Sequence, residues 1–123
     1  MVGAPGETFE NYLETVELNR QARPDSMQMT TYYPFPGSDL HDYAVAQGFF
    51  AGAAYTDSFV SYPLLKMPQF PRWQIDYAAR TFDLRVHAAV GSGVMVRLAL
   101  LKHLVGALVR SVRRNLREMR AFI

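Results

Sequence analysis

Two short runs rich in glycine and proline hold the residues of this chain best suited to contact a ligand. Glycines let a ligand approach the backbone, and amides at the start of a helix attract anionic groups. Aromatic side chains offer flat faces for a planar base. The structural alternatives are a tight turn with a helix cap for the first run and a proline-stiffened connection for the second. The candidate binding residues are Gly3, Pro5, Gly6 and Glu7 in the first run and Tyr33, Pro34, Phe35, Pro36 and Gly37 in the second.

Other kinds of site find little support in the sequence. The three histidines (His41, His87 and His103) are too far apart for a metal motif, and capping or solvent contact explains them more simply. No serine lies in a Gly-x-Ser-x-Gly setting, and no phosphate loop ends in Lys-Ser/Thr. The acids Glu10, Glu14 and Glu17 lie along one helix and are interpreted as its solvated face. We therefore predict no metal site, and the sequence leaves the catalytic residues unidentified.

Each of the two runs lies where a strand is expected to end and a helix to begin. Met1 and Val2 resemble the end of a buried strand, and Thr8 is an N-cap for an amphipathic helix over 9–21, with Phe9, Tyr12, Leu13 and Val16 on one face. Residues 26–31 alternate as a short strand does, and Ser38 with Asp39 caps a second helix over 40–47. Parallel α/β folds build their sites at such strand ends.

The second half of the chain is predicted to contain a loop and two more helices. Residues 49–69 are aromatic and irregular, which indicates a loop crossing the surface. A third helix begins near Pro71, with Ile75, Ala79, Phe82 and Val86 on one face and Trp73, Tyr77 and Leu84 beside them. The last helix runs from about Val94 onward. Its apolar residues recur at spacings of four and three and form the apolar seam: Val94, Leu98, Leu101, Val105, Leu108, Val112, Leu116, Met119 and Ile123.

The two runs and the helix between them carry a family resemblance. The run Gly3-Ala4-Pro5-Gly6-Glu7-Thr8, the following helix, residues 25–31, the run 33–38 and Leu40 resemble the carboxyl-terminal half of a radical S-adenosylmethionine (radical SAM) barrel. They are most similar to the branch whose members also carry a cobalamin-binding domain. The resemblance implies S-adenosylmethionine near the candidate residues. It also implies an iron–sulfur cluster and, in that branch, cobalamin, bound by residues outside this chain. The activity implied for the parent protein is methyl transfer or carbon-radical chemistry.

One departure from that family limits what the chain does alone. Radical SAM enzymes hold their cluster with three cysteines in a Cys-x-x-x-Cys-x-x-Cys loop, and this chain has no cysteine. We therefore expect a truncated half, a remnant or one part of a split protein, with truncation the simplest account. The chain alone is expected to be inactive and to need the missing amino-terminal half of the barrel as its partner.

The predicted fold class is a helix-rich α/β chain of four helices and at most two or three short strands. Residues 1–90 would form part of an incomplete, TIM-like parallel barrel, and residues 94–123 a basic amphipathic helix, with Gly91-Ser92-Gly93 between them.

The charge of the chain divides at the same glycine-rich boundary. Residues 1–92 carry six Lys and Arg against ten acids, and residues 93–123 carry seven against Glu118 alone. Half of the 123 residues are apolar, as in an ordinary globular domain.

The terminal helix admits three roles. On a helical wheel its arginines lie broadly opposite the apolar seam: Arg110, Arg113, Arg114, Arg117 and Arg120. The helix could dock on its own domain with a solvated basic face, or lie on an anionic membrane, or bind nucleic acid. Docking is favoured, membrane contact follows, and nucleic acid is disfavoured because aromatic interleaving is missing. The charged residues interrupting the helix disfavour a transmembrane span.

No signal peptide is visible, so a cytoplasmic protein is expected, with contact at the inner membrane face as an option. The alternative function is thus a non-catalytic interaction module whose basic helix binds anionic membrane or a partner protein.

Overall fold

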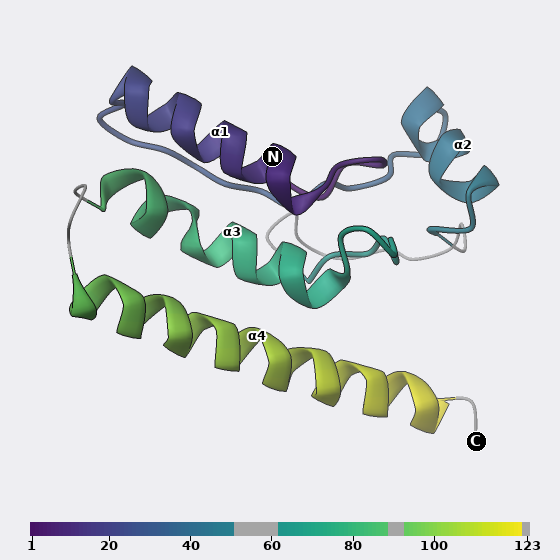
Figure 1. The fold of residues 1–123 in the computed structure, drawn as a ribbon. Coiled ribbons are helices and arrows are strands. Elements are labelled where there is room, and N and C mark those ends of the chain that lie inside the picture. The colour runs from purple at the N-terminus through teal and green to yellow at the C-terminus, as the bar shows by residue number, and fades with distance from the viewer. Residues whose placement is uncertain (51–61, 89–92, 122–123) are drawn as a thin grey trace.

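The structure, a computed structural model, describes residues 1–50, 62–88 and 93–121. Within these ranges it contains four helices: α1 (Phe9–Ala22), α2 (Asp39–Ala46), α3 (Arg72–His87) and α4 (Val94–Ala121). Helix α3 packs against both α1 and α4 and lies between them, while α2 lies to one side (Figure 1). The four expected helices are therefore present, each within one or two residues of its predicted start.

Local capping explains where α1 and α2 begin and end. The Thr8 hydroxyl accepts a hydrogen bond from the Asn11 amide, and the Asn11 side chain accepts one from the Thr8 amide, which closes a capping box. Helix α1 ends at Arg23, whose φ of 49° is left-handed. The Ser38 hydroxyl caps α2 through the His41 amide. Capping is a local property of the chain, and for this reason the sequence predicts these boundaries well.

A single parallel β-bridge joins the amino-terminal segment to the segment before the second run. It pairs Val2 with Thr31: the Val2 amide donates to the Thr30 carbonyl at 2.9 Å, and the Tyr32 amide donates to the Val2 carbonyl at 2.8 Å. The strand expected over 26–31 does not extend along the described segment beyond this bridge. A strand needs a hydrogen-bonded neighbour along its length, and among the described residues Val2 alone is bridged to this segment. That the chain is part of a parallel barrel stays a prediction.

The hydrophobic core lies between α1, α3 and the loop that precedes α3. Its buried members are Val2, Tyr12, Val16, Tyr32, Ala44, Leu65, Met67, Phe70, Ile75, Ala78, Phe82 and Val86. Two expectations are corrected here. Leu13 lies on the exposed side of α1, because the buried stripe is narrower than predicted. Within residues 62–69, which we expected on the surface, Leu65 and Met67 are instead buried in the core; residues 51–61 of that predicted loop lie outside the described residues.

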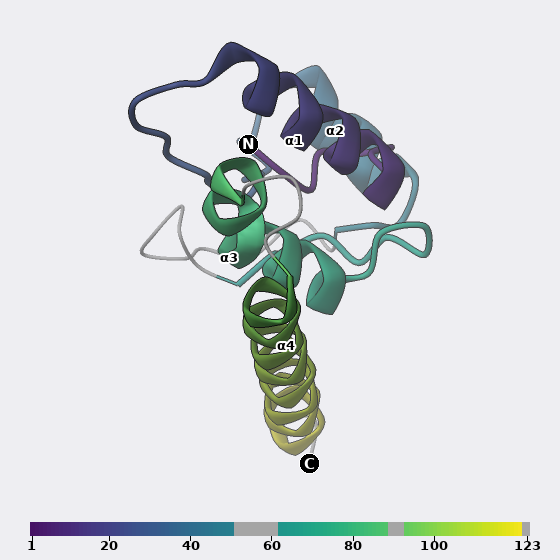
Figure 2. The same ribbon diagram turned by 60° about the vertical axis from the view of Figure 1, so that its left-hand side comes forward.

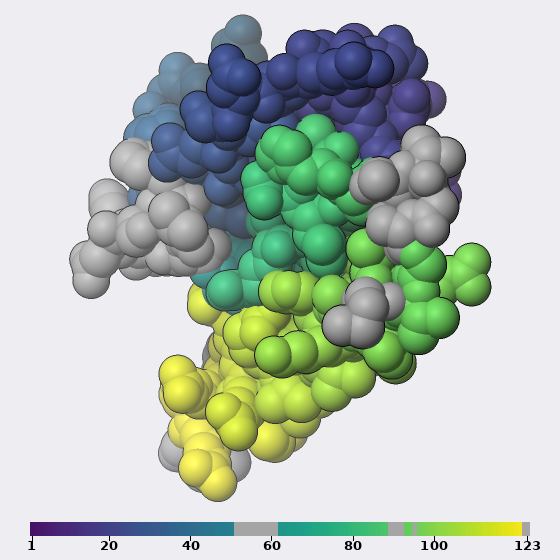
Figure 3. Space-filling view, turned by 90° about the vertical axis from the view of Figure 1, so that its left-hand side faces the viewer, coloured from purple at the N-terminus to yellow at the C-terminus, as the bar shows by residue number. Residues whose placement is uncertain are grey.

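Helix α4 docks on α3 through the side opposite to the one expected. The eight described residues of the apolar seam are between 43% and 71% exposed, whereas Ala107 is fully buried; Ile123 lies outside the described residues. On the docked side, Arg110 reaches the buried carboxylate of Asp76, with Nε and Nη2 each 2.8 Å from Oδ2. The expectation of an occupied seam is therefore wrong. Of the expected basic face, Arg110 and Arg114 are engaged within the chain, whereas Arg113, Arg117 and Arg120 are exposed. This orientation of α4 pairs the buried Asp76 with Arg110. In Figure 3 α4 makes up the lower part of the molecule.

Candidate ligand-binding edge

The bridge between Val2 and Thr31 brings the two predicted runs to the same edge of the fold. Because the pairing is parallel, the chain leaves both segments in the same direction. Residues 3–7 then lead into α1, and residues 33–37 lead into α2. The structure thus assembles, through backbone hydrogen bonds, two loops that are a helix apart in the sequence.

The first loop is held in shape by its own residues. Gly3 has a φ of +85°, and a Cβ added to it would lie 2.8 Å from Cγ2 of Ile75, so the position needs glycine for its conformation and for packing on α3. A Glu7 carboxylate oxygen accepts hydrogen bonds from the amides of Gly3 at 2.5 Å and Ala4 at 3.1 Å. The tight turn expected of these residues is therefore observed, while the cap of α1 comes from Thr8. Glu7 fixes the loop through this contact, for which the sequence carries no signal.

The exposed parts of the two loops are the residues that remain accessible. Gly6 and Gly37 have φ values of +87° and +84°, and a Cβ on either would meet nothing within 4 Å. The Phe35 side chain is 53% exposed, and its ring lies 4.8 Å from that of Tyr33 in an edge-to-face pair. Pro34, by contrast, is fully buried. The accessible candidates are thus Gly6, Phe35, Pro36 and Gly37, with Pro5 and Tyr33 half-buried beside them.

The residues present do not fit an iron–sulfur cluster. Thiolates are the ligands such clusters need, and the chain contains no cysteine. Across the described ranges, no group of three or more His, Asp or Glu side chains is arranged to hold a metal ion. Any contribution of this edge to cofactor binding would therefore be contact with an organic group by backbone and aromatic side chains.

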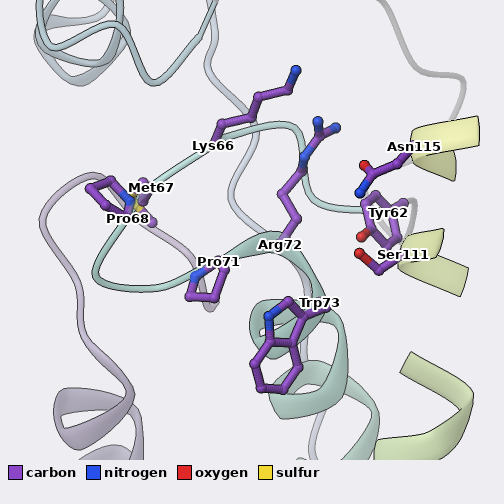
Figure 4. Close-up of a pocket in the computed structure, with 9 residues that line it drawn as sticks. All are labelled: Tyr62, Lys66, Met67, Pro68, Pro71, Arg72, Trp73, Ser111 and Asn115. Carbon is purple, nitrogen blue, oxygen red and sulfur yellow. The ribbon is translucent and has the colours of Figure 1, made fainter. Parts of the chain in front are cut away.

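A separate pocket of about 480 Å³ lies where α4 meets the loop before α3 (Figure 4). It is lined by Tyr62, Lys66, Met67, Pro68, Pro71, Arg72, Trp73, Ser111 and Asn115. The sequence gives no sign of this pocket, because its walls come from segments far apart in the chain. None of the candidate binding residues lines it, so it is not an extension of the edge formed by the two loops.

An ion-pair cluster around Glu118 lies beside this pocket. Arg72 donates to both carboxylate oxygens at 3.0 and 3.2 Å, Arg114 donates to one of them at 3.2 Å, and Lys66 Nζ lies 3.5 Å away. Burial by itself would raise the pKa of Glu118, but the hydrogen bond and charge of Arg72, helped by Lys66 and Arg114, outweigh it and lower that pKa. The cluster fixes the carboxyl-terminal half of α4 to the body. Its cations are therefore engaged within the chain.

Comparisons with known proteins give one short match. A stretch of 42 residues, 34% of this chain, is 43% identical to a tRNA-2-methylthio-N(6)-dimethylallyladenosine synthase from Sulfurihydrogenibium sp. (strain YO3AOP1). The matched stretch spans about 10% of that protein's length. No protein-family model matches the chain, and no solved structure does. The matched protein is a radical SAM enzyme, so this stretch weakly supports a relation of the chain to the radical SAM superfamily.

Proposed function

We propose that this chain is the carboxyl-terminal part of a radical SAM enzyme, in which the two loops form one side of the S-adenosylmethionine site. The parent enzyme would be of the cobalamin-dependent type and would carry out methyl transfer or carbon-radical chemistry. The iron–sulfur cluster and cobalamin would be held by parts of the protein other than these 123 residues. The chain alone would then be inactive.

The observation that carries the proposal is the parallel bridge between Val2 and Thr31. It supports the proposal because it unites, at one edge, the two sequence motifs on which the resemblance rests. The short match to a radical SAM enzyme supports the same superfamily. Parallel barrels place their sites at the carboxyl ends of strands, and both loops directly follow a bridged segment.

Each accessible residue has a role that its chemistry suits. The exposed ring of Phe35 offers an apolar face on which adenine could pack. Gly6 and Gly37 leave open space above the backbone, where a side chain would otherwise stand. Glu7, held by the amides of Gly3 and Ala4, keeps the first loop in a fixed shape rather than reaching outward.

The first test is the genomic DNA upstream of Met1. An in-frame Cys-x-x-x-Cys-x-x-Cys would support truncation, whereas a stop codon followed by a separate ribosome-binding site would contradict it. The purified chain and the longer product should then be reconstituted anaerobically with iron and sulfide. We expect a visible cluster band and deoxyadenosine formation from the longer product alone. A stable cluster spectrum from the 123-residue chain would overturn the proposal.

The second test addresses the loops in the longer product. Phe35→Ala should weaken S-adenosylmethionine binding by about tenfold, since stacking of an aromatic side chain on a base is worth about 1–3 kcal/mol. Leu18→Ala is the matched control, because Leu18 is also exposed but lies on α1. Equal affinities for the two variants would remove this loop from the site.

A further inference from the structure

We propose that the solvent-facing side of α4 binds an anionic lipid surface, with the helix lying in the plane of the interface. The proposal rests on the way α4 docks and is independent of the proposed enzymatic function. The binding surface consists of the described apolar seam and the exposed cations beside it.

The apolar seam is exposed along the whole described helix. Its eight described members run from Val94 to Met119, and each is at least 43% exposed. At about 1.5 Å of rise per residue this stripe is roughly 38 Å long. An uninterrupted apolar stripe of that length is far larger than the isolated apolar residues that a soluble surface normally carries.

The body of the protein leaves the seam uncovered because it holds α4 by the opposite side. That side is fixed by buried Ala107, by Arg110 on Asp76 and by Glu118 on Arg72. Figure 2 shows α4 on the side of α3 away from α1, where it projects from the rest of the described chain. Contact with a flat surface would therefore require no rearrangement of the fold.

The charges around the seam identify the occupant. Lys102, Arg113 and Arg120 follow one another at whole-turn spacing along one flank of the seam, Arg97 lies on the other flank, and all are exposed. The only acid of the described helix is Glu118, which is engaged on the docked side. Pairing the seams of two copies would bring these cations close to one another. Anionic headgroups complement them, and an apolar face flanked by cations suits an interfacial helix.

None of the described helices is long and apolar enough to cross a bilayer. The geometry proposed is accordingly an in-plane one, in which the seam enters the boundary between headgroups and acyl chains. The cations would remain at headgroup level, with their aliphatic stems along the edge of the seam.

The test is sedimentation of the full chain with vesicles of phosphatidylcholine alone and of phosphatidylcholine with phosphatidylserine. Binding should rise with phosphatidylserine content and fall with added salt, because salt screens the attraction. Arg113→Glu should weaken partitioning to anionic vesicles by about tenfold, since each cation near such a surface contributes strongly. Arg23→Glu is the matched control: it makes the same charge change at an exposed position at the end of α1.

A second pair of variants tests the seam itself. Leu101→Asn with Val105→Asn should abolish binding while leaving the circular dichroism spectrum unchanged, because both side chains are already exposed. Leu18→Asn, on α1, should bind like the unaltered chain. Three results would overturn the proposal: no lipid-dependent pelleting of the full chain, equal binding to neutral and anionic vesicles, or self-association that the seam substitutions abolish. The last would assign the seam to a second copy of the chain.

Discussion

At the scale of single residues, Gly3 tolerates a side chain less well than the other glycines of the two loops. Gly3 and Gly6 share a positive φ, but only at Gly3 would a Cβ clash, with Ile75. We expect Gly6→Ala to lower the free energy of unfolding by about 1 kcal/mol, the cost of a left-handed backbone. Gly3→Ala should cost about 3 kcal/mol, because overpacking adds to that cost. Urea denaturation of both variants measures the difference, and equal losses would contradict it.

Tyr12 links α1 to α3 through a buried hydrogen bond. Its hydroxyl donates to the Ala78 carbonyl at 2.8 Å, and burial raises the pKa of the Tyr12 phenol above 10.0. Tyr12→Phe should lower the free energy of unfolding by about 1 kcal/mol. A raised pKa favours the neutral phenol in the folded state, so this stabilisation is complete below pH 10.0 and is lost as the pH rises through the folded-state pKa. Alkaline denaturation should therefore show a loss specific to Tyr12 that the phenylalanine variant lacks.

At the scale of elements, the contact of α4 with α3 depends on a buried carboxylate. Asp76 is paired with Arg80 from its own helix and with Arg110 from α4. Arg110→Ala should destabilise the chain by about 2 kcal/mol, because it removes one of the two partners of a buried charge. Arg113→Ala, at an exposed site on the same helix, should change stability by less than about 0.5 kcal/mol. A double-mutant cycle that combines Arg110→Ala with Asp76→Asn should give a non-zero coupling energy. Additive effects of the two substitutions would show that the Arg110–Asp76 pair does not fix α4.

The docking of the carboxyl-terminal half of α4 should depend on pH through Glu118. Its pKa is lowered from the ordinary 4.5, so the stabilisation is present above pH 4.5 and is lost as the pH falls through the lowered value. Trp73, the only tryptophan, lines the pocket beside α4 and can report undocking by its fluorescence. We expect an acid transition below pH 4.5 in the unaltered chain and none in Glu118→Gln. The same transition in both proteins would exclude Glu118 as its origin.

At the scale of the whole molecule, the chain on its own should be marginally stable or self-associating. The paired segments at Val2 and Thr31 lack further described strand neighbours, and such strand edges promote association. Sedimentation velocity and thermal unfolding check this expectation. Association through these edges should persist in the Leu101→Asn, Val105→Asn variant, which separates it from contacts of the apolar seam. A sharp monomeric transition with a high midpoint would argue against a barrel fragment.

The sequence predicts best those helices whose ends are set by residues close to them in the chain. The cap at Thr8, the stop at Arg23 and the cap at Ser38 depend on neighbouring residues, so the bounds of α1 and α2 follow from short windows of sequence. The periodic seam likewise predicts α4 and its apolar stripe. The two loops are also recognisable as a pair in the sequence, although the sequence does not show which of their residues are accessible.

Which side of α4 meets the body was decided by tertiary structure alone. A helical wheel shows that one face is apolar, but it does not contain Asp76 and Arg72, which come from another helix and pair with Arg110 and Glu118. Burying Asp76 without such a partner would be costly, and pairing it turns the side of α4 that carries Ala107 and Arg110 toward the body. The burial of Leu65 and Met67, and the clash that restricts Gly3, likewise depend on neighbours remote in sequence. Sequence determined the helices and their apolar faces, whereas long-range charge pairing and packing decided which faces are covered.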